Sequence, residues 1–159
     1  AKKAYEMAGI GPQDVNLIEL HDCFATAEML HYENLGICKD GEAGKLIDEK
    51  QVYLGGRIPV NVSGGLLSKG HPLGATGLAQ CTELVWHQRG TAGERQVPNA
   101  KIALQHNLGL GGACVVTMAR PANADFPNRS GSAGNHWRAK PSCCIASRDW
   151  GTQSSFAGT

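Results

Sequence analysis

Apolar residues recur along the first 120 residues in patterns typical of buried strands and of helices. Residues 15–20 (VNLIEL) are apolar on both alternating faces, which predicts a strand covered from two sides. The next segment, 24–35, has apolar residues at a loose helical spacing, so we expect a helix there with Asp22 as its N-cap. Residues 1–9 resemble the last turns of a helix that ends at a glycine, so the chain reads as part of something longer.

A glycine-rich segment, 63–77 (SGGLLSKGHPLGATG), lies at the centre of the sequence. Pro72 suits a first helical position because its missing N–H costs nothing there. We therefore expect a helix to begin at His71-Pro72 and to run to about Arg89, with Gly90 as its cap. An imidazole at such a helix start lies beside unpaired N–H groups and the positive end of the helix dipole, where developing negative charge is stabilised. A helix entry with an incidental histidine is the plain alternative.

The remaining segments complete an α/β pattern. Residues 36–57 are rich in glycine and charge, and we expect a long surface excursion that is functional or mobile. Residues 58–62 predict a short strand. Residues 101–106 and 113–119 predict two further strands, and the connection between them is short enough to require an antiparallel pair.

Composition limits the classes of function. The chain has 159 residues, of which 42% are hydrophobic and 18% charged, as expected for one domain with a real core. A formal net charge of +1 offers no basic stripe for nucleic acid, and no apolar run approaches membrane-spanning length. The glycines match neither G-x-G-x-x-G nor a Walker A motif, so we do not expect nucleotide binding. The six cysteines include no C-x-x-C pair, which favours a reducing compartment.

The character of the chain changes after Pro121. Residues 123–159 are dominated by Asn, Ser, Gly, Ala and Arg, without a sustained period. We therefore expect one domain over 1–121 and a low-complexity tail over 122–159 that is disordered or poorly packed. Trp137 and Trp150 would instead anchor the tail if they pack on the domain or on a partner.

Several residues that carry chemistry lie at the ends of predicted strands. His21 and Cys23 follow the strand 15–20, and His106 ends the strand 101–106. Ligands of open α/β sheets bind at the carboxyl ends of strands, although Cys23 alone is more simply a small buried hydrophobe. Together with His71 these residues would also make a zinc site, but none of their spacings is a short metal-binding pair, so we expect no metal.

Three segments together resemble the C-terminal half of a thiolase, most closely the sterol-carrier-protein-2 (SCP-x) type. They are 19–24 (ELHDCF), 61–77 (NVSGGLLSKGHPLGATG) and 105–112 (QHNLGLGG). Three motifs in this order are far more specific than any one of them. The resemblance covers the chain up to about Pro121 and does not include the tail.

The resemblance implies a mixed sheet between helix layers, with strand order 3-2-4-5-1 and strand 5 antiparallel. Residues 15–20 would then be strand 2, residues 58–62 strand 3, and the predicted hairpin strands 4 and 5. Strand 1 and much of the first helix would be missing. The loss of an edge strand would leave strand 5 unpaired on one side, which invites docking or aggregation.

Thiolases transfer acyl groups between coenzyme A thioesters, either by condensing two acyl-CoAs or by cleaving a 3-oxoacyl-CoA with free CoA. This chemistry needs a nucleophilic thiolate, an acid/base group and donors for oxyanions. In the family the nucleophilic cysteine belongs to the N-terminal half, which this chain does not contain. We therefore expect the isolated chain to be inactive.

The resemblance also suggests roles for individual residues. His71 would activate the thiolate and donate to the thioester oxygen, and Cys23 would be the acid/base cysteine. His21 would belong to the oxyanion hole, because it stands where the commoner motif has a water-holding asparagine. His106 stands where many thiolases keep the cysteine of a C-x-G motif, and we count it among the catalytic residues.

Contacts with the substrate are expected from Ser63 and Gly64. Backbone N–H groups near Leu108 would complete a second oxyanion hole. No tightly bound cofactor is implied, and the partners would be acyl-CoA, CoA and a second copy of the full-length protein in a homodimer. The setting would be lipid metabolism such as fatty acid β-oxidation, in a peroxisome or mitochondrion of a eukaryote or the cytoplasm of a bacterium.

Other functions remain open on the sequence alone. A non-catalytic CoA-binding, lipid-binding or interaction module is the main alternative to a thiolase fragment. Ketoacyl synthases also pair a cysteine with histidines, but the segment 21–24 (HDCF) fits them poorly. The cysteine at position 23 argues against the related aldolase branch.

Overall fold

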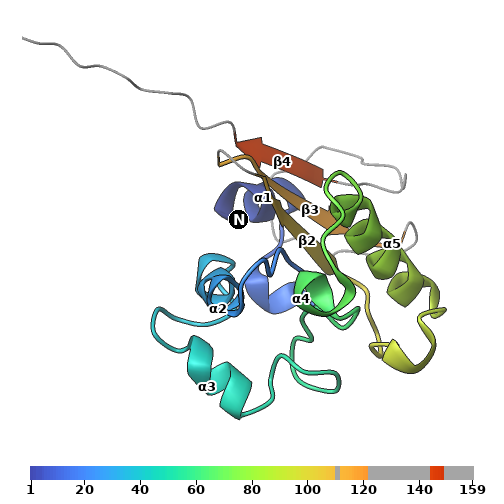
Figure 1. Ribbon diagram of the computed structural model, residues 1–159, viewed down its shortest axis with the longest axis horizontal. Coiled ribbons are helices and arrows are strands. Elements are labelled where there is room, and N and C mark those ends of the chain that lie inside the picture. The colour runs from blue at the N-terminus through green and yellow to red at the C-terminus, as the bar shows by residue number, and fades with distance from the viewer. Residues whose placement is uncertain (110–111, 122–143, 149–159) are drawn as a thin grey trace, which may run out of the picture.

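The computed structural model describes residues 1–109, 112–121 and 144–148. In these ranges four strands form one mixed sheet in the order β1-β2-β3-β4 (Figure 1). The strands are β1 (Leu17–Glu19), β2 (Ala103–Leu108), β3 (Cys114–Ala119) and β4 (Cys144–Arg148). β1 and β2 are parallel, and the other two pairs are antiparallel.

Helices cover both faces of the sheet, as the α/β pattern predicts (Figure 1). They are α1 (Lys2–Ala8), α2 (Ala25–Asn34), α3 (Ala43–Asp48), α4 (Gly65–Lys69) and α5 (Thr76–Arg89). Short 3-10 turns at Pro12–Asp14 and Gly93–Arg95 complete the described elements. No helix in the described ranges is long and apolar enough to cross a membrane.

Neighbouring residues of the central strands divide the core into two clusters. Ile18 and Leu104 join a cluster that includes residues of α1, α2 and α3. Leu17, one position earlier in β1, packs with Leu84 of α5 in the second cluster. Successive side chains of a strand point to opposite faces, so the apolar run at 15–20 is buried from both sides as predicted.

The hairpin of β2 and β3 is also confirmed, with Ala103 opposite Ala119 and Leu108 opposite Cys114. The strand predicted at 58–62 is reduced to one parallel bridge between Val60 and Ile18. Proline at position 59 has no N–H to donate, and Asn61 is in the left-handed region with φ 50°. Regular pairing therefore stops after a single bridge.

The edge of β3 is not free, which corrects the expectation of an unpaired last strand. β4 pairs antiparallel with β3 from Cys114–Arg148 to Met118–Cys144. No hydrophobic period in this region predicted a strand. The rest of the predicted tail, with Trp137 and Trp150, lies outside the described residues.

The helix expected at His71-Pro72 begins later. Residues 72–75 form a turn in which Pro72 O accepts the N–H groups of Ala75 and Thr76, and α5 starts at Thr76. Gly74 has φ 83°, a conformation that right-handed helices do not contain, so the helix cannot include it. The predicted end is correct, since α5 stops at Arg89 with Gly90 in the left-handed region.

The segment 36–57 is more than a surface excursion. It contains α3, and Ile37, Leu46 and Val52 are buried against the core. Its apolar residues are too few and too irregularly spaced to predict this packing from the sequence. The segment also forms a wall of the pocket described below.

Candidate active site

Two histidines that are fifty residues apart in the sequence meet at one edge of the fold. His21 follows β1, and His71 lies in the turn before α5. The ring centroids are 4.9 Å apart, with an interplanar angle of 85°. His21 is buried and His71 is exposed, so the pair connects the interior to the surface.

Asn107 fixes the orientation of His21. The Nδ1 atom of His21 lies 3.0 Å from Oδ1 of Asn107 at the end of β2. A Cβ atom on Gly77 would lie 2.6 Å from the Asn107 amide nitrogen, so a glycine makes room for this side chain. Burial, together with the nearby His71, lowers the pKa of His21 below its ordinary value. His21 is therefore neutral near pH 7.

His71 is held by the first residue of α5. Its Nδ1 atom lies 2.7 Å from the hydroxyl oxygen of Thr76, which is buried. The ring thus remains beside the helix start, although the helix begins four residues after Pro72, the predicted first position. Neither Thr76 nor Asn107 was singled out from the sequence, but both lie within motifs that carry the resemblance.

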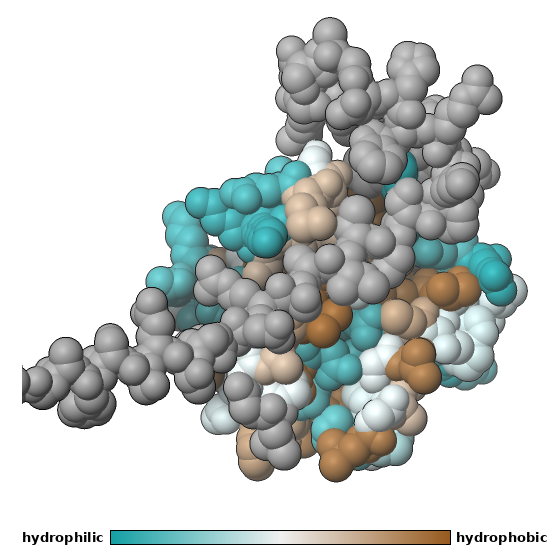
Figure 2. Space-filling model, turned by 90° about the horizontal axis from the view of Figure 1, so that it is seen from above, coloured by the Kyte–Doolittle hydropathy of each residue, from teal (hydrophilic) through white to brown (hydrophobic). Residues whose placement is uncertain are grey.

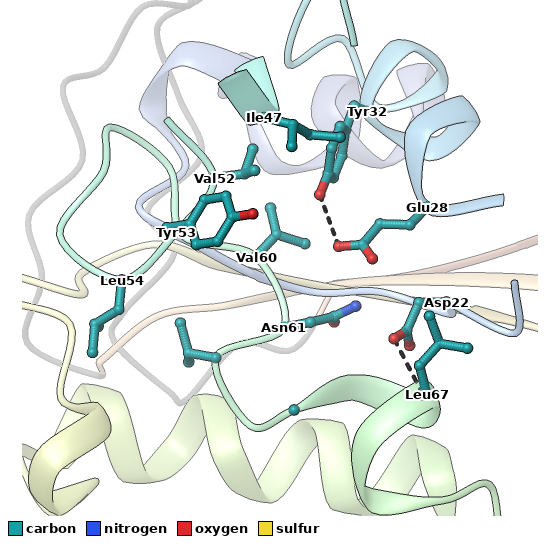
Figure 3. Close-up of a pocket in the computed structure, with 12 residues that line it drawn as sticks. Asp22, Glu28, Tyr32, Ile47, Val52, Tyr53, Leu54, Val60, Asn61 and Leu67 are labelled. Carbon is teal, nitrogen blue, oxygen red and sulfur yellow. Dashed lines mark hydrogen bonds between the residues drawn. The ribbon is translucent and has the colours of Figure 1, made fainter. Parts of the chain in front are cut away.

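Asp22 connects the two loops that carry these histidines. Its Oδ1 accepts the N–H of Leu66 at 2.7 Å. Its Oδ2 accepts the N–H of Leu67 at 3.4 Å (Figure 3). This finding corrects the prediction that Asp22 caps α2, whose N-cap position is held by Phe24. A Cβ on Gly65 would meet the Asp22 carboxylate at 2.1 Å, so only glycine allows this close approach.

A second link ties the same glycine-rich loop to β1. Ser63 donates its N–H at 3.1 Å and its hydroxyl at 2.6 Å to the carboxylate of Glu19, which is fully buried. Lys69 lies 3.7 Å from the same carboxylate. Burial raises the pKa of Glu19, and the Ser63 bonds and Lys69 oppose that rise. Ser63, expected to contact substrate, therefore directs both donors toward the fold.

The other predicted residues are distributed around this centre. Cys23 is a half-buried free thiol in the segment between His21 and α2. Leu108 ends β2, directly after Asn107. Gly64 has φ 100° and lines the pocket described below.

His106 belongs to the interior. It is buried, and its ring packs at a centroid distance of 4.3 Å against His31 of α2. Burial first, and then the His31 and His21 rings, lower the pKa of His106 to about 3. The Nδ1 of His106 and the Nε2 of His31 are buried without a hydrogen-bond partner among the described residues. The sequence offered no signal for His31, a single histidine on a helix.

A pocket of about 430 Å³ adjoins the site on the side of Asp22 (Figure 3). Carboxylates of Asp22 and Glu28 face it, and Tyr32 donates its hydroxyl to Glu28 at 2.8 Å. Burial raises the pKa of Glu28. The remaining walls are mostly apolar and include Ile47, Val52, Tyr53, Leu54, Val60, Val62 and Leu67.

Large apolar side chains are exposed on the segments that carry the site. The exposed fractions are 70% for Phe24, 56% for Leu67, 80% for Leu73 and 71% for Leu78. Figure 2 shows apolar residues interspersed with polar ones on one face of the molecule. Exposed apolar patches rimmed by polar residues mark sites of interaction with proteins, membranes or ligands.

The arrangement is suited to proton transfer and to binding of an oxygen atom, since two imidazoles are in contact and a thiol is close in sequence. Within the described residues, no group of three or more His, Cys, Asp or Glu side chains is placed to hold a metal ion.

Comparison with known proteins assigns the chain to a family. The profile of the family described as thiolase C-terminal domain-like matches residues 1–119. Sterol carrier protein 2 of Rattus norvegicus is 60% identical over 136 residues, which are 86% of this chain and 24% of the relative. The human protein of that name is 56% identical over the same shares.

Two further matches are more distant. An acetyl-CoA acetyltransferase of Methanothermobacter thermautotrophicus is 48% identical over 73% of this chain and 30% of its own length. A solved structure described as the Ltp2-ChsH2(DUF35) aldolase matches with a TM-score of 0.60 and 30% identity, over 66% of this chain and 26% of that chain. The chain spans about a quarter of the length of its sterol carrier protein relatives. The chain belongs to the thiolase C-terminal domain-like family.

Proposed function

We propose that this chain supplies the acid/base and oxyanion half of a thiolase active site, which cleaves or forms 3-oxoacyl-CoA in lipid metabolism. The observation that carries this proposal is the contact of His21 with His71, each held through Nδ1 by its own chain. The acetyltransferase relative named above supports the same reaction class.

In this proposal His71 takes the proton of a nucleophilic thiol and then, as an imidazolium, donates to the thioester oxygen. Cys23 moves the proton at carbon two of the substrate. His21 and the backbone near Leu108 line the oxyanion region. The buried, neutral His106 supports the ring of His31 and the strand end from within.

The nucleophile comes from a second thiolase half in this proposal. The exposed apolar residues Phe24, Leu67, Leu73 and Leu78 then form the surface that this half covers. A full-length protein with both halves acts on acyl-CoA and CoA as a homodimer. In a eukaryote its place would be a peroxisome or mitochondrion.

The proposal is tested in a chimera in which residues 1–119 replace the corresponding part of the rat relative. Cys23→Ala should still load a labelled acyl group in a single turnover and then stall, because the nucleophile and its activator remain. His71→Ala should fail to load. If Cys23→Ala turns over normally while His106→Ala stalls, the acid/base role belongs to the later turn.

The pocket beside Asp22 favours a second candidate, a non-catalytic module that binds an acyl-CoA or a lipid. The isolated chain distinguishes the two, because a binding module saturates with acyl-CoA without its other half. A thiolase half alone should show neither turnover of acetoacetyl-CoA nor saturable binding.

An aldolase is a third candidate, since the solved structure that matches is described as one. Carbon–carbon cleavage by a retro-aldol step needs no thiol. Cys23→Ala would then leave the activity of the chimera unchanged.

A further inference from the structure

The pocket beside Asp22 has a polar end and an apolar body (Figure 3). Asn61, Asp22 and Glu28 supply the polar end, and the rest of the wall is mostly apolar, for example at Val52 and Val60. None of the described residues that line the pocket is Lys, Arg or His. Its volume of about 430 Å³ lies within the range of small-molecule sites.

Asn61 presents a hydrogen-bond donor at the polar end. Its Oδ1 accepts the N–H of Leu20 at 2.8 Å, which fixes the orientation of the amide group. Its Nδ2 is buried and has no hydrogen-bond partner among the described residues. In Figure 3 this nitrogen points toward the side of the pocket where Asp22 and Glu28 lie. A buried N–H group without a partner is unfavourable, so a ligand that accepts from it gains affinity.

The two carboxylates present acceptors at the same end. Tyr32 donates to Oε1 of Glu28 at 2.8 Å, so the second oxygen of that carboxylate keeps its lone pairs for a ligand. Burial raises the pKa of Glu28, the bond from Tyr32 opposes that rise, and the charge of Asp22 adds to it. An ionised Glu28 accepts a hydrogen bond, and a protonated one both donates and accepts.

These groups select among ligands by their capacity for hydrogen bonds. An ammonium group only donates, so it would leave Nδ2 of Asn61 without an acceptor. A carboxylate or phosphate only accepts, and two carboxylates without a basic residue beside them would repel it. A hydroxyl group does both, and it brings no charge into the pocket.

We propose that the pocket binds an uncharged apolar molecule through a hydroxyl group, which accepts from Asn61 and donates to the carboxylate of Glu28. The apolar part of the ligand lies against walls such as Val52 and Val60. The proposal rests on the pocket named above as a lipid site and not on the thiolase reaction. The phosphates of CoA suit this pocket poorly, because the same carboxylates repel them.

The first test uses 1-hexanol as the probe. It is titrated into the labelled 159-residue chain and followed by the NMR signals of the Asn61 side-chain amide and of the Val52 and Val60 methyl groups. We expect a saturable shift, and an affinity that rises roughly fourfold for each CH₂ group added between 1-butanol and 1-hexanol.

Three further probes test the selection. Hexylamine only donates at neutral pH, hexanoate only accepts, and dipropyl ether, an isomer of 1-hexanol, accepts but cannot donate. Each should bind roughly tenfold more weakly than 1-hexanol. Binding of any of them that equals or exceeds that of 1-hexanol, or the absence of saturable 1-hexanol binding, would overturn the proposal.

Substitution of Asn61 tests the donor. Asn61→Asp keeps the acceptor for the N–H of Leu20 but removes the Nδ2 donor, so 1-hexanol should bind about tenfold more weakly and hexylamine more tightly. Aspartate tolerates the φ of 50° at this position. Asn16→Asp is the matched control, because its Oδ1 likewise accepts backbone N–H groups and it does not line the pocket. Equal losses in the two variants would contradict the proposal.

A second variant keeps the test independent of how Asn61→Asp folds. Glu28→Gln retains an acceptor oxygen and removes the charge, so 1-hexanol affinity should stay within about threefold of the wild type. A larger loss would show that the pocket selects a cation. The chimera with the rat relative should bind 1-hexanol as well, and failure there would show that the second half fills the pocket, which overturns the proposal. Turnover of the chimera is measured separately, so a failure of the thiolase proposal is distinguishable.

Discussion

Two histidines at opposite ends of α5 show how the same side chain serves different purposes. His87, in the last turn, is 2% exposed, its Nδ1 accepts the N–H of Val97 at 3.0 Å, and its Nε2 lies 3.3 Å from Glu83. His71, before the first turn, is exposed and is bonded through Nδ1 to Thr76. Both nitrogens of His87 thus face polar groups of the fold, whereas the described residues bond His71 through Nδ1 only.

The surroundings of the two rings differ in the same way. Glu83 beside His87 is held by Arg95 through contacts of 2.8 and 3.2 Å, so that end of the helix is a closed polar network. The other end is surrounded by exposed apolar residues such as Leu73 and Leu78. The network around His87 stabilises the fold, whereas the exposed apolar residues near His71 suit contact with a partner or a substrate.

The largest effect should separate the two histidines by turnover. In the chimera with the rat relative, His71→Ala removes the base and an oxyanion donor, so kcat should fall on the order of a hundredfold or more. His87→Ala should keep kcat within a few-fold at temperatures where the protein is folded. The comparison breaks if both variants lose turnover equally while remaining folded by circular dichroism.

The next effect concerns stability, for which we expect His87→Ala to cost more than His71→Ala. His87→Ala leaves the N–H of Val97 without its acceptor and opens a cavity, so the free energy of unfolding should fall by about 2–4 kcal/mol. His71→Ala should change it by about 0.5 kcal/mol or less, because the side chain is exposed. Urea unfolding of the 159-residue chain measures both values. A larger loss for His71→Ala would show that the open ring is structural.

The sequence predicts part of the fold and part of the candidate site. The apolar patterns predicted β1 and the hairpin, and Gly90 predicted the end of α5, because each signal depends on neighbours within a few residues. The motifs singled out His21 and His71 separately, and their contact was not predicted. Gly74 gave a local clue that the helix starts late, yet the proline before it suggested an earlier start.

Features that depend on distant partners could not be predicted in this way. Asp22 looks like a cap for the helix that follows it, but its carboxylate binds α4, more than forty residues away. The packing of His31 on His106 joins α2 to β2, and no spacing in the sequence reveals it. The same limit applies to β4, whose sequence has no strand pattern.

A smaller effect concerns His106, whose surroundings resemble neither those of His71 nor those of His87. Its pKa is lowered to about 3, so between that pH and its ordinary value of 6.5 the unfolded chain binds a proton that the folded chain does not. This histidine therefore contributes stability that is complete above pH 6.5 and is lost as the pH falls toward 3. His106→Leu should reduce the slope of unfolding free energy against pH by about 1 kcal/mol per pH unit in this window.

The measurement is urea unfolding at pH 7, 5.5 and 4.5, with the slopes compared rather than the absolute values. His21, His31 and His87 also have lowered pKa values, so the variant should keep part of the pH dependence. Identical slopes for wild type and variant would show that His106 is protonated in the folded state.

The position of β4 has a consequence for the order in which the molecule is made. The strand pairs with β3 and contacts α1, so a helix and a strand that are far apart in the sequence pack side by side. On a ribosome the edge of β3 stays open until residue 148 has emerged, and an open edge can pair with a neighbouring nascent chain. The yield of folded protein should therefore depend on translation speed between the codons for Ala119 and Cys144.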